Sequence, residues 1–166
     1  MKAFVTGARR GIGKAIALAL AEAGYDVAVN DVADSAELKA TVAEISALGV
    51  KAVAVIGDIS DIAAHTAMLE KAESALGFLT TLVNNAGVSV QSRGDLLDVT
   101  PESYDRCLSV NTRGTFFLTQ AFAKRLKPSK DHRSIVTISS ANASGVSITR
   151  GEYCISKAGA SMMSKL

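Results

Sequence analysis

The chain has 166 residues, of which 48% are hydrophobic and 5% aromatic, and its formal net charge is +2. These values suit one domain with one sizeable core, and the scattered basic residues give no support to a nucleic-acid partner. No apolar run reaches the roughly 18 residues of a membrane span and no signal peptide is recognisable, so a membrane partner is not expected. Cys107 and Cys154 form no spaced pair, which favours a reduced, cytoplasmic protein.

Short β-branched runs alternate with longer segments that carry apolar residues at helical spacing. The expected strands are 2–6, 26–30, 51–56, 81–84 and 134–139. The expected helices are 14–23, 35–48, 61–76 and 102–126, the last one starting at Thr100-Pro101, and a further helix carries residues 153–157. Repeated β-α-β units demand a parallel sheet with right-handed crossovers. The sequence therefore predicts a single α/β domain over residues 1–166 with a doubly wound, Rossmann-like parallel sheet.

A glycine-rich turn joins the first expected strand to the first expected helix. Its sequence is Thr6-Gly7-Ala8-Arg9-Arg10-Gly11-Ile12-Gly13. Glycines let the backbone approach a pyrophosphate, and the N–H groups at the helix start supply donors and partial positive charge. We therefore expect a dinucleotide to contact Gly7, Arg10, Gly11, Ile12 and Gly13.

Asp31 ends the second expected strand, 18 residues after Gly13. A carboxylate there can accept hydrogen bonds from the adenosine ribose and would repel a 2′-phosphate, which favours NAD. Arg10 favours NADP instead, because its guanidinium could reach such a phosphate. NAD is thus the first choice and NADP the second, while Asp31 as a plain turn residue stays an alternative.

Lys157 follows Tyr153 by four residues, and Ser140 precedes it by thirteen. Residues four apart on a helix share a face, so the lysine cation can favour the phenolate and lower the tyrosine pKa. A tyrosine tuned in this way can pass a proton near neutral pH. Ser140, at the end of a strand, could hold the substrate oxygen. The alternative for Tyr153 and Lys157 is an ordinary surface pair.

Taken together, these motifs resemble the short-chain dehydrogenase/reductase family. Residues 84–87, Asn-Asn-Ala-Gly, resemble the family segment that lines the cofactor, which implies contacts from Asn85, Ala86 and Gly87. Asn111 stands where the family has a catalytic asparagine that anchors a water relay, and Asp58 and Ile59 stand where it contacts adenine. The resemblance implies catalytic roles for Asn111, Ser140, Tyr153 and Lys157, and contacts of the last two with the cofactor.

Within the family, residues 9–13, 110–115 and 153–157 are most similar to the 3-oxoacyl-acyl-carrier-protein reductase group. The implied reaction is hydride transfer between a nicotinamide cofactor and an alcohol, a ketone or an acyl thioester. The family's sixth and seventh strands would need at least ~60 more residues, so we expect a chain that lacks its last strands. The resemblance implies a homo-oligomer for the full-length form, and a non-catalytic nucleotide-binding module is the alternative.

The remaining polar and aromatic residues carry weaker expectations. His65 and His132 have no partner at ligand spacing, so both are expected to be exposed and no metal site is expected. Phe116 and Phe117 are expected in the core or a helix contact, and Cys154 is expected to pack. The substrate pocket mouth is expected near six residues, with Arg93 and Arg150 as possible carboxylate partners. These six are Ser89, Val90, Gln91, Val146, Ser147 and Ile148.

Overall fold

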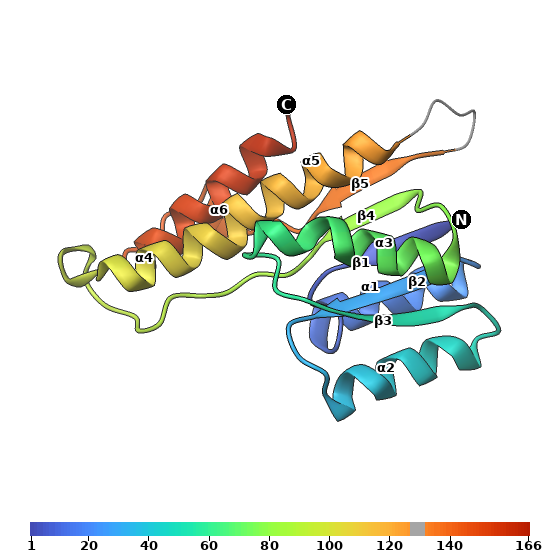
Figure 1. Cartoon of the computed structure of the whole chain (residues 1–166). Helices are drawn as coiled ribbons and strands as arrows, with labels where there is room; N and C mark the ends of the chain where they lie inside the picture. Colours follow the sequence, from blue (N-terminus) through green and yellow to red (C-terminus); the bar gives the residue numbers. More distant parts are fainter. Residues whose placement is uncertain (127–131) are drawn as a thin grey trace.

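The computed structural model describes residues 1–126 and 132–166. They form a five-stranded, all-parallel sheet in the order β3-β2-β1-β4-β5 (Figure 1). The strands are β1 (Lys2–Val5), β2 (Asp26–Asp31), β3 (Ala52–Ile56), β4 (Thr81–Asn84) and β5 (Ser134–Thr137). The chain reverses its direction across the sheet after β3, so β1 and β4 lie side by side at the switch point. This topology confirms the predicted doubly wound fold.

Helices cover both faces of the sheet, which explains the near-continuous apolar runs in its strands. One core packs Ala3, Val5, Val27 and Val29 against α1 (Gly11–Glu22) and α2 (Ala36–Ala47). The other packs Phe4, Ala28 and Leu82 against α3 (His65–Leu76) and α5 (Thr115–Arg125). The alternation of β1 side chains between the two faces thus builds two cores from one strand. α6 (Gly151–Met163) packs beside α4 (Pro101–Leu108).

Helix starts follow their capping residues. The Ser35 hydroxyl accepts a hydrogen bond from the Leu38 amide at the start of α2. The Thr100 hydroxyl does the same for the Ser103 amide at the start of α4, where Pro101 is the first helical residue, as the sequence predicts.

The expected helix 102–126 is not continuous, and this prediction was wrong in detail. A π-helical turn, Ser109–Gly114, separates α4 from α5. Asn111 in this turn is nearly fully buried, and its side chain bonds to the Val88 backbone. Gly114 packs so closely on the backbone of Ile59 that a Cβ would clash there. Such turns often mark functional sites, and apolar periodicity alone does not reveal them. Helix 61–76 is likewise split, because a 3-10 turn, Ile62–Ala64, precedes α3.

Two expectations about side-chain burial were wrong. His65 was expected to be exposed but is buried, with 2% exposure, and its Nε2 lies 2.8 Å from the Ile59 carbonyl oxygen. Phe116 is 40% exposed and stacks edge to face on the half-buried Phe117. His132 is exposed as expected. None of the helices in the described ranges has the length and apolar character of a membrane span.

Candidate active site

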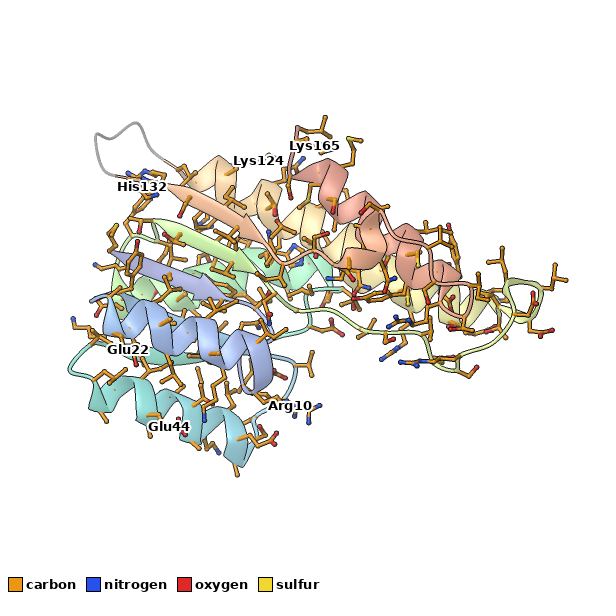
Figure 2. All side chains as sticks on the ribbon, turned by 180° about the vertical axis from the view of Figure 1, so that it is seen from behind. Arg10, Glu22, Glu44, Lys124, His132 and Lys165 are labelled. Atoms are coloured by element: carbon orange, nitrogen blue, oxygen red, sulfur yellow. The ribbon has the colours of Figure 1, made fainter. Side chains whose placement is uncertain are left out.

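A cleft of about 800 Å³ opens at the carboxyl ends of β1 to β4. This is where open parallel sheets bind ligands. Ten of the predicted cofactor-contacting residues line it: Gly7, Arg10, Ile12, Gly13, Asp31, Asp58, Ile59, Asn85, Ala86 and Gly87. Gly11, Tyr153 and Lys157 are not part of its lining. Figure 2 shows Arg10 at the N-terminal end of α1, beside this edge of the sheet.

The glycine turn is held by the loop that follows β4. The Thr6 hydroxyl accepts hydrogen bonds from the amides of Asn85 and Ala86, at 3.0 and 2.9 Å. In return, the Asn85 side-chain amide donates to the carbonyls of Thr6 and Gly7. Gly7 has φ +62°, and a Cβ on it would lie 2.9 Å from the Ala86 Cα. Only glycine suits both this backbone conformation and this close approach.

The N-terminus of α1 faces the cleft without a side-chain cap. Arg10 is the N-cap residue in an extended conformation, and it makes no capping hydrogen bond. The first-turn amides therefore keep their donor capacity and partial positive charge for an anion. No acidic side chain in this first turn would offset that charge.

Asp31 ends β2 as predicted and is 8% exposed. Its Oδ1 accepts a hydrogen bond from the Val32 amide and lies 3.5 Å from Nε of Arg9. Sequence reasoning singled out Arg10 and missed Arg9 as a partner of this carboxylate. The available signal was the position of both residues at the carboxyl ends of adjacent parallel strands, because Arg9 follows β1 and Asp31 ends β2.

Asp58 and Ile59 follow β3 and line the same end of the cleft. The Asp58 carboxylate also accepts a hydrogen bond from the Ser60 amide at 2.8 Å, which forms a local turn. Asp58 therefore has a local structural role in addition to its position in the cleft.

Lys157 on α6 lies next to Gly87, a residue of the cleft lining. A Cβ on Gly87 would lie 3.3 Å from Lys157 Nζ and 3.1 Å from Asn111 Oδ1. The ammonium donates a hydrogen bond of 2.9 Å to the Ile138 carbonyl, and burial lowers the pKa of Lys157. In the part of the chain that the structure describes, its bond goes to this carbonyl rather than to the Tyr153 hydroxyl.

Asn111 connects the loop after β4 to α6. Its Oδ1 accepts from the Val88 amide, and its Nδ2 donates to the Val88 carbonyl and to the hydroxyl of Ser156. The Ser156 hydroxyl in turn donates to the Tyr153 carbonyl at 2.8 Å. This chain of bonds fixes the turn of α6 that holds both Tyr153 and Lys157. Ser156, fully buried, was not singled out from the sequence.

Ser140 and Tyr153 lie on elements that pack together. The predicted strand 134–139 ends at Thr137, and Ser140 follows in extended conformation as the cap of a 3-10 turn, Ala141–Ala143. That turn packs on α6. The Ser140 Oγ accepts from the Asn142 amide, and the half-buried Tyr153 ring lies 5.7 Å below the Arg150 guanidinium.

A second cavity, of about 470 Å³, lies between α6 and the loop after β5. Val146, Ser147 and Ile148 line it as expected, together with Leu96, Cys154 and Ile155. Ser89, Val90 and Gln91 do not line it. Arg150 donates to Asn142 and Ser147, so its guanidinium already has partners. The walls are mainly aliphatic.

The cleft and its donors fit an extended nucleotide. The volume of the cleft, the uncapped helix start and the glycine contacts suit a pyrophosphate, while Asp31 suits a ribose hydroxyl. Comparison with known proteins agrees with this geometry. The model of the short chain dehydrogenase family matches residues 1–166. The chain belongs to the short-chain dehydrogenase family.

Several relatives of this short-chain dehydrogenase are oxidoreductases by name. Versicolorin reductase 1 of Aspergillus parasiticus is 40% identical over 75% of this chain and 47% of its own length. L-rhamnose 1-dehydrogenase (NAD(P)(+)) of a Sphingomonas species is 36% identical over 90% of this chain and 57% of its own. The chain spans about half the length of the curated relatives it matches.

A solved 3-oxoacyl-[acyl-carrier protein] reductase from Brucella melitensis, in complex with NAD, has the same architecture. It is 42% identical with a TM-score of 0.90, over 95% of this chain and 62% of that one. This likeness confirms the fold and the similarity to the reductase group predicted from the sequence.

Proposed function

We propose that this short-chain dehydrogenase transfers hydride between NAD(H) and an alcohol or ketone, with Tyr153 as the acid-base. The observation that carries the proposal is that the side chains of Lys157 and Asn111 both lie close to Gly87. Gly87 lines the nucleotide cleft, while Lys157 shares α6 with Tyr153. The proposed proton donor therefore belongs to a helix that approaches the cleft wall at Gly87.

When bound, the nicotinamide would supply or accept the hydride. Tyr153 would give its hydroxyl proton to the oxygen of a ketone during reduction, and take it back during oxidation. Ser140 would donate a hydrogen bond to the same oxygen. The Lys157 cation would favour the phenolate of Tyr153 and bind the nicotinamide ribose.

Asn111 is proposed to hold this site in place and to anchor a proton relay. Its side-chain bonds to Val88 and Ser156 connect the loop lining the cleft with the turn below Tyr153. Replacing it would move both the cofactor wall and the acid-base together.

NAD is the proposed cofactor, with NADP second. Asp31 is placed where a carboxylate can accept hydrogen bonds from ribose hydroxyls. The Brucella melitensis reductase, which was solved with NAD, supports this choice. Gly7 and Gly13 of the cleft lining, with Gly11 between them in the glycine turn, would approach the pyrophosphate. Asp58 and Ile59 would lie near adenine.

The proposed substrate is a small molecule with an apolar body, such as an aliphatic ketone or an acyl thioester. Leu96, Val146, Ile148 and Ile155 line the second cavity, next to the proposed acid-base helix. Burial of such side chains against a substrate would contribute about 25 cal/mol per Å² of apolar surface.

We also propose that the protein acts as a cytoplasmic homo-oligomer. Both cysteines are free thiols, in keeping with a reducing compartment. Phe116 on α5 and Met162 on α6 are exposed apolar residues, and such residues occur at association surfaces. Light scattering of the purified protein would give its mass, and a strict monomer would contradict this part.

The decisive experiment is the Tyr153→Phe substitution in the protein as its own organism produces it. The change removes the transferable proton and keeps the ring, so turnover should fall by at least ~100-fold. NADH affinity, measured by fluorescence titration, should stay within about threefold. A Phe variant that keeps most of its turnover would refute the role of Tyr153. NADH binding without any ketone reduction by the wild type would favour the non-catalytic nucleotide-binding module instead.

A further inference from the structure

Arg150 lies between the two elements that carry Ser140 and Tyr153. It directly precedes α6 and is half-buried. Its Nη2 donates a hydrogen bond of 3.0 Å to Oδ1 of Asn142, which belongs to the 3-10 turn that Ser140 caps. Its Cζ lies 5.7 Å from the centre of the Tyr153 ring. The guanidinium therefore contacts the ring of Tyr153 directly and reaches Ser140 through Asn142.

Asn142 connects this guanidinium to Ser140. Its backbone amide donates to the Ser140 Oγ at 3.1 Å, and its side-chain amide donates to the Gly145 carbonyl at 3.2 Å. A hydroxyl that accepts a hydrogen bond can still donate its own proton, so Ser140 stays able to bind a substrate oxygen. The side chain of Asn142 is thus held from two sides, by Gly145 and by Arg150. A shift of the guanidinium would therefore move the turn that orients Ser140.

The planar guanidinium suits these contacts. Its Nε donates to the Ser147 hydroxyl at 3.3 Å while Nη2 donates to Asn142, and a cation within about 6 Å of an aromatic ring is attracted to it. Asn142 and Ser147 line the second cavity, whereas Arg150 does not. Arg150 is therefore placed to hold the wall of the cavity rather than to bind a substrate.

We propose that Arg150 is a positioning residue that sets the separation between Ser140 and Tyr153. This inference rests on the proposed function, in which both residues must reach the same oxygen of a ketone. Ser140 follows a strand and Tyr153 lies on a helix, so their separation depends on how these two elements are held together. A misplacement of about 1 Å can cost roughly 100-fold in rate.

The first test measures the reduction of two ketones by NADH, namely ethyl acetoacetate, which is neutral, and acetoacetate, which carries a carboxylate. With both ketones, Arg150→Met should lower kcat by about tenfold or more. The KM for the ketone and the dissociation constant of NADH should change by less than about threefold. Arg150→Lys should recover only part of kcat, because an ammonium lacks the planar fork of donors.

Arg113→Met is the matched control for this substitution. The Arg113 guanidinium also lies over an aromatic ring, 5.8 Å from the centre of Phe117, but the residue is exposed and lines neither cavity. Its kcat should stay within about twofold of the wild type.

Asn142→Ala tests the connection itself. The change removes the acceptor for Arg150 and keeps the backbone amide that donates to Ser140. It should lower kcat by about tenfold, and adding Arg150→Met should lower kcat by less than about threefold more, because the same connection is already broken. Effects of the two substitutions that multiply in full would show that the residues act separately, against the inference.

A measurement without turnover separates this inference from the proposed function. The chain has three tyrosines, so NMR spectra of protein with isotope-labelled tyrosine are simple, and Tyr153→Phe identifies the Tyr153 resonance. Asn142→Ala should shift this resonance, because it releases the cation over the ring, and should leave those of Tyr25 and Tyr104 in place. If the wild type reduces neither ketone and the shift is present, only the hydride-transfer assignment fails.

Four results would overturn the inference. Arg150→Met could leave kcat for ethyl acetoacetate unchanged. Its effect could be confined to a higher KM for acetoacetate, which would make Arg150 a ligand of a substrate carboxylate instead. It could weaken NADH binding as much as it lowers kcat, as a merely structural residue would. Finally, the Tyr153 resonance could be insensitive to Asn142→Ala.

Discussion

Ser103 and Glu152 form a buried hydrogen bond next to the proposed acid-base, Tyr153. Removing this hydrogen bond tests how strongly it holds α6 in place. Ser103 Oγ donates to Glu152 Oε1 at 2.6 Å, and the two residues are 7% and 3% exposed. Ser103 also accepts from the Gln91 amide at 3.3 Å. Glu152 directly precedes Tyr153. The pair therefore connects α4, the loop after β4 and the first turn of α6.

Ser103→Ala should lower the free energy of unfolding by about 2 kcal/mol. A hydrogen bond to a charged group contributes about 1.5 to 3 kcal/mol, and the longer amide bond adds roughly 0.5. Alanine recovers up to about 0.5 kcal/mol through its higher helix propensity. The carboxylate left behind is near Cys107, whose thiol pKa is raised by burial and then by the Glu152 charge.

Urea unfolding followed by circular dichroism, with linear extrapolation, measures this loss. Ser46→Ala, at an exposed position of α2, is the matched control and should stay within about 0.5 kcal/mol of the wild type. In a Glu152→Gln background the cost of Ser103→Ala should shrink, because the charge is gone. A cost below about 0.5 kcal/mol in the unmodified background would refute the reasoning.

Three further predictions concern the nucleotide cleft. Asp31→Ser should weaken NADH binding about 5- to 150-fold through one or two lost ribose bonds, and an unchanged dissociation constant would exclude this contact. Gly7→Ala should cost about 1 to 3 kcal/mol of stability and reduce nucleotide affinity, because φ is +62° and Ala86 is close. Gly24→Ala, with φ +82° in open space, is its control and should leave affinity unchanged in titrations. Lys157→Met should remove a part of the pH dependence of the free energy of unfolding. Because burial depresses the pKa of Lys157, the wild type should gain stability relative to the variant as pH rises toward 10.5, in urea unfolding at pH 7 to 10.

Most of the fold could be predicted because periodicity and glycine placement report local structure. All five strands were located to within two residues at each end, and the Thr100 and Ser35 caps lie at helix starts. The π turn at Asn111 could not be predicted, because it results from the Val88 backbone and the close approach of Gly114 to Ile59. These contacts come from segments distant in sequence.

In the candidate site, too, the positions of residues could be predicted better than their contacts. Motif order brought ten predicted residues to one cleft, since they follow neighbouring parallel strands. The partners of each side chain were less predictable. Lys157 bonds to the Ile138 carbonyl, and Arg9 rather than Arg10 pairs with Asp31. The burial of His65 was also missed, because its partner is a backbone carbonyl that has no sequence signature.

The bonds of the Thr6 hydroxyl also have a consequence for folding. Its partners Val83, Asn85 and Ala86 follow it by 77 to 80 residues in the chain. During synthesis the first strand and its glycine turn emerge long before β4 exists, and contacts so distant in sequence form slowly. The β1-α1-β2 unit can therefore fold early without a finished phosphate-binding turn. The turn becomes rigid only when β4 docks beside β1, so a nascent chain would acquire nucleotide affinity late and abruptly.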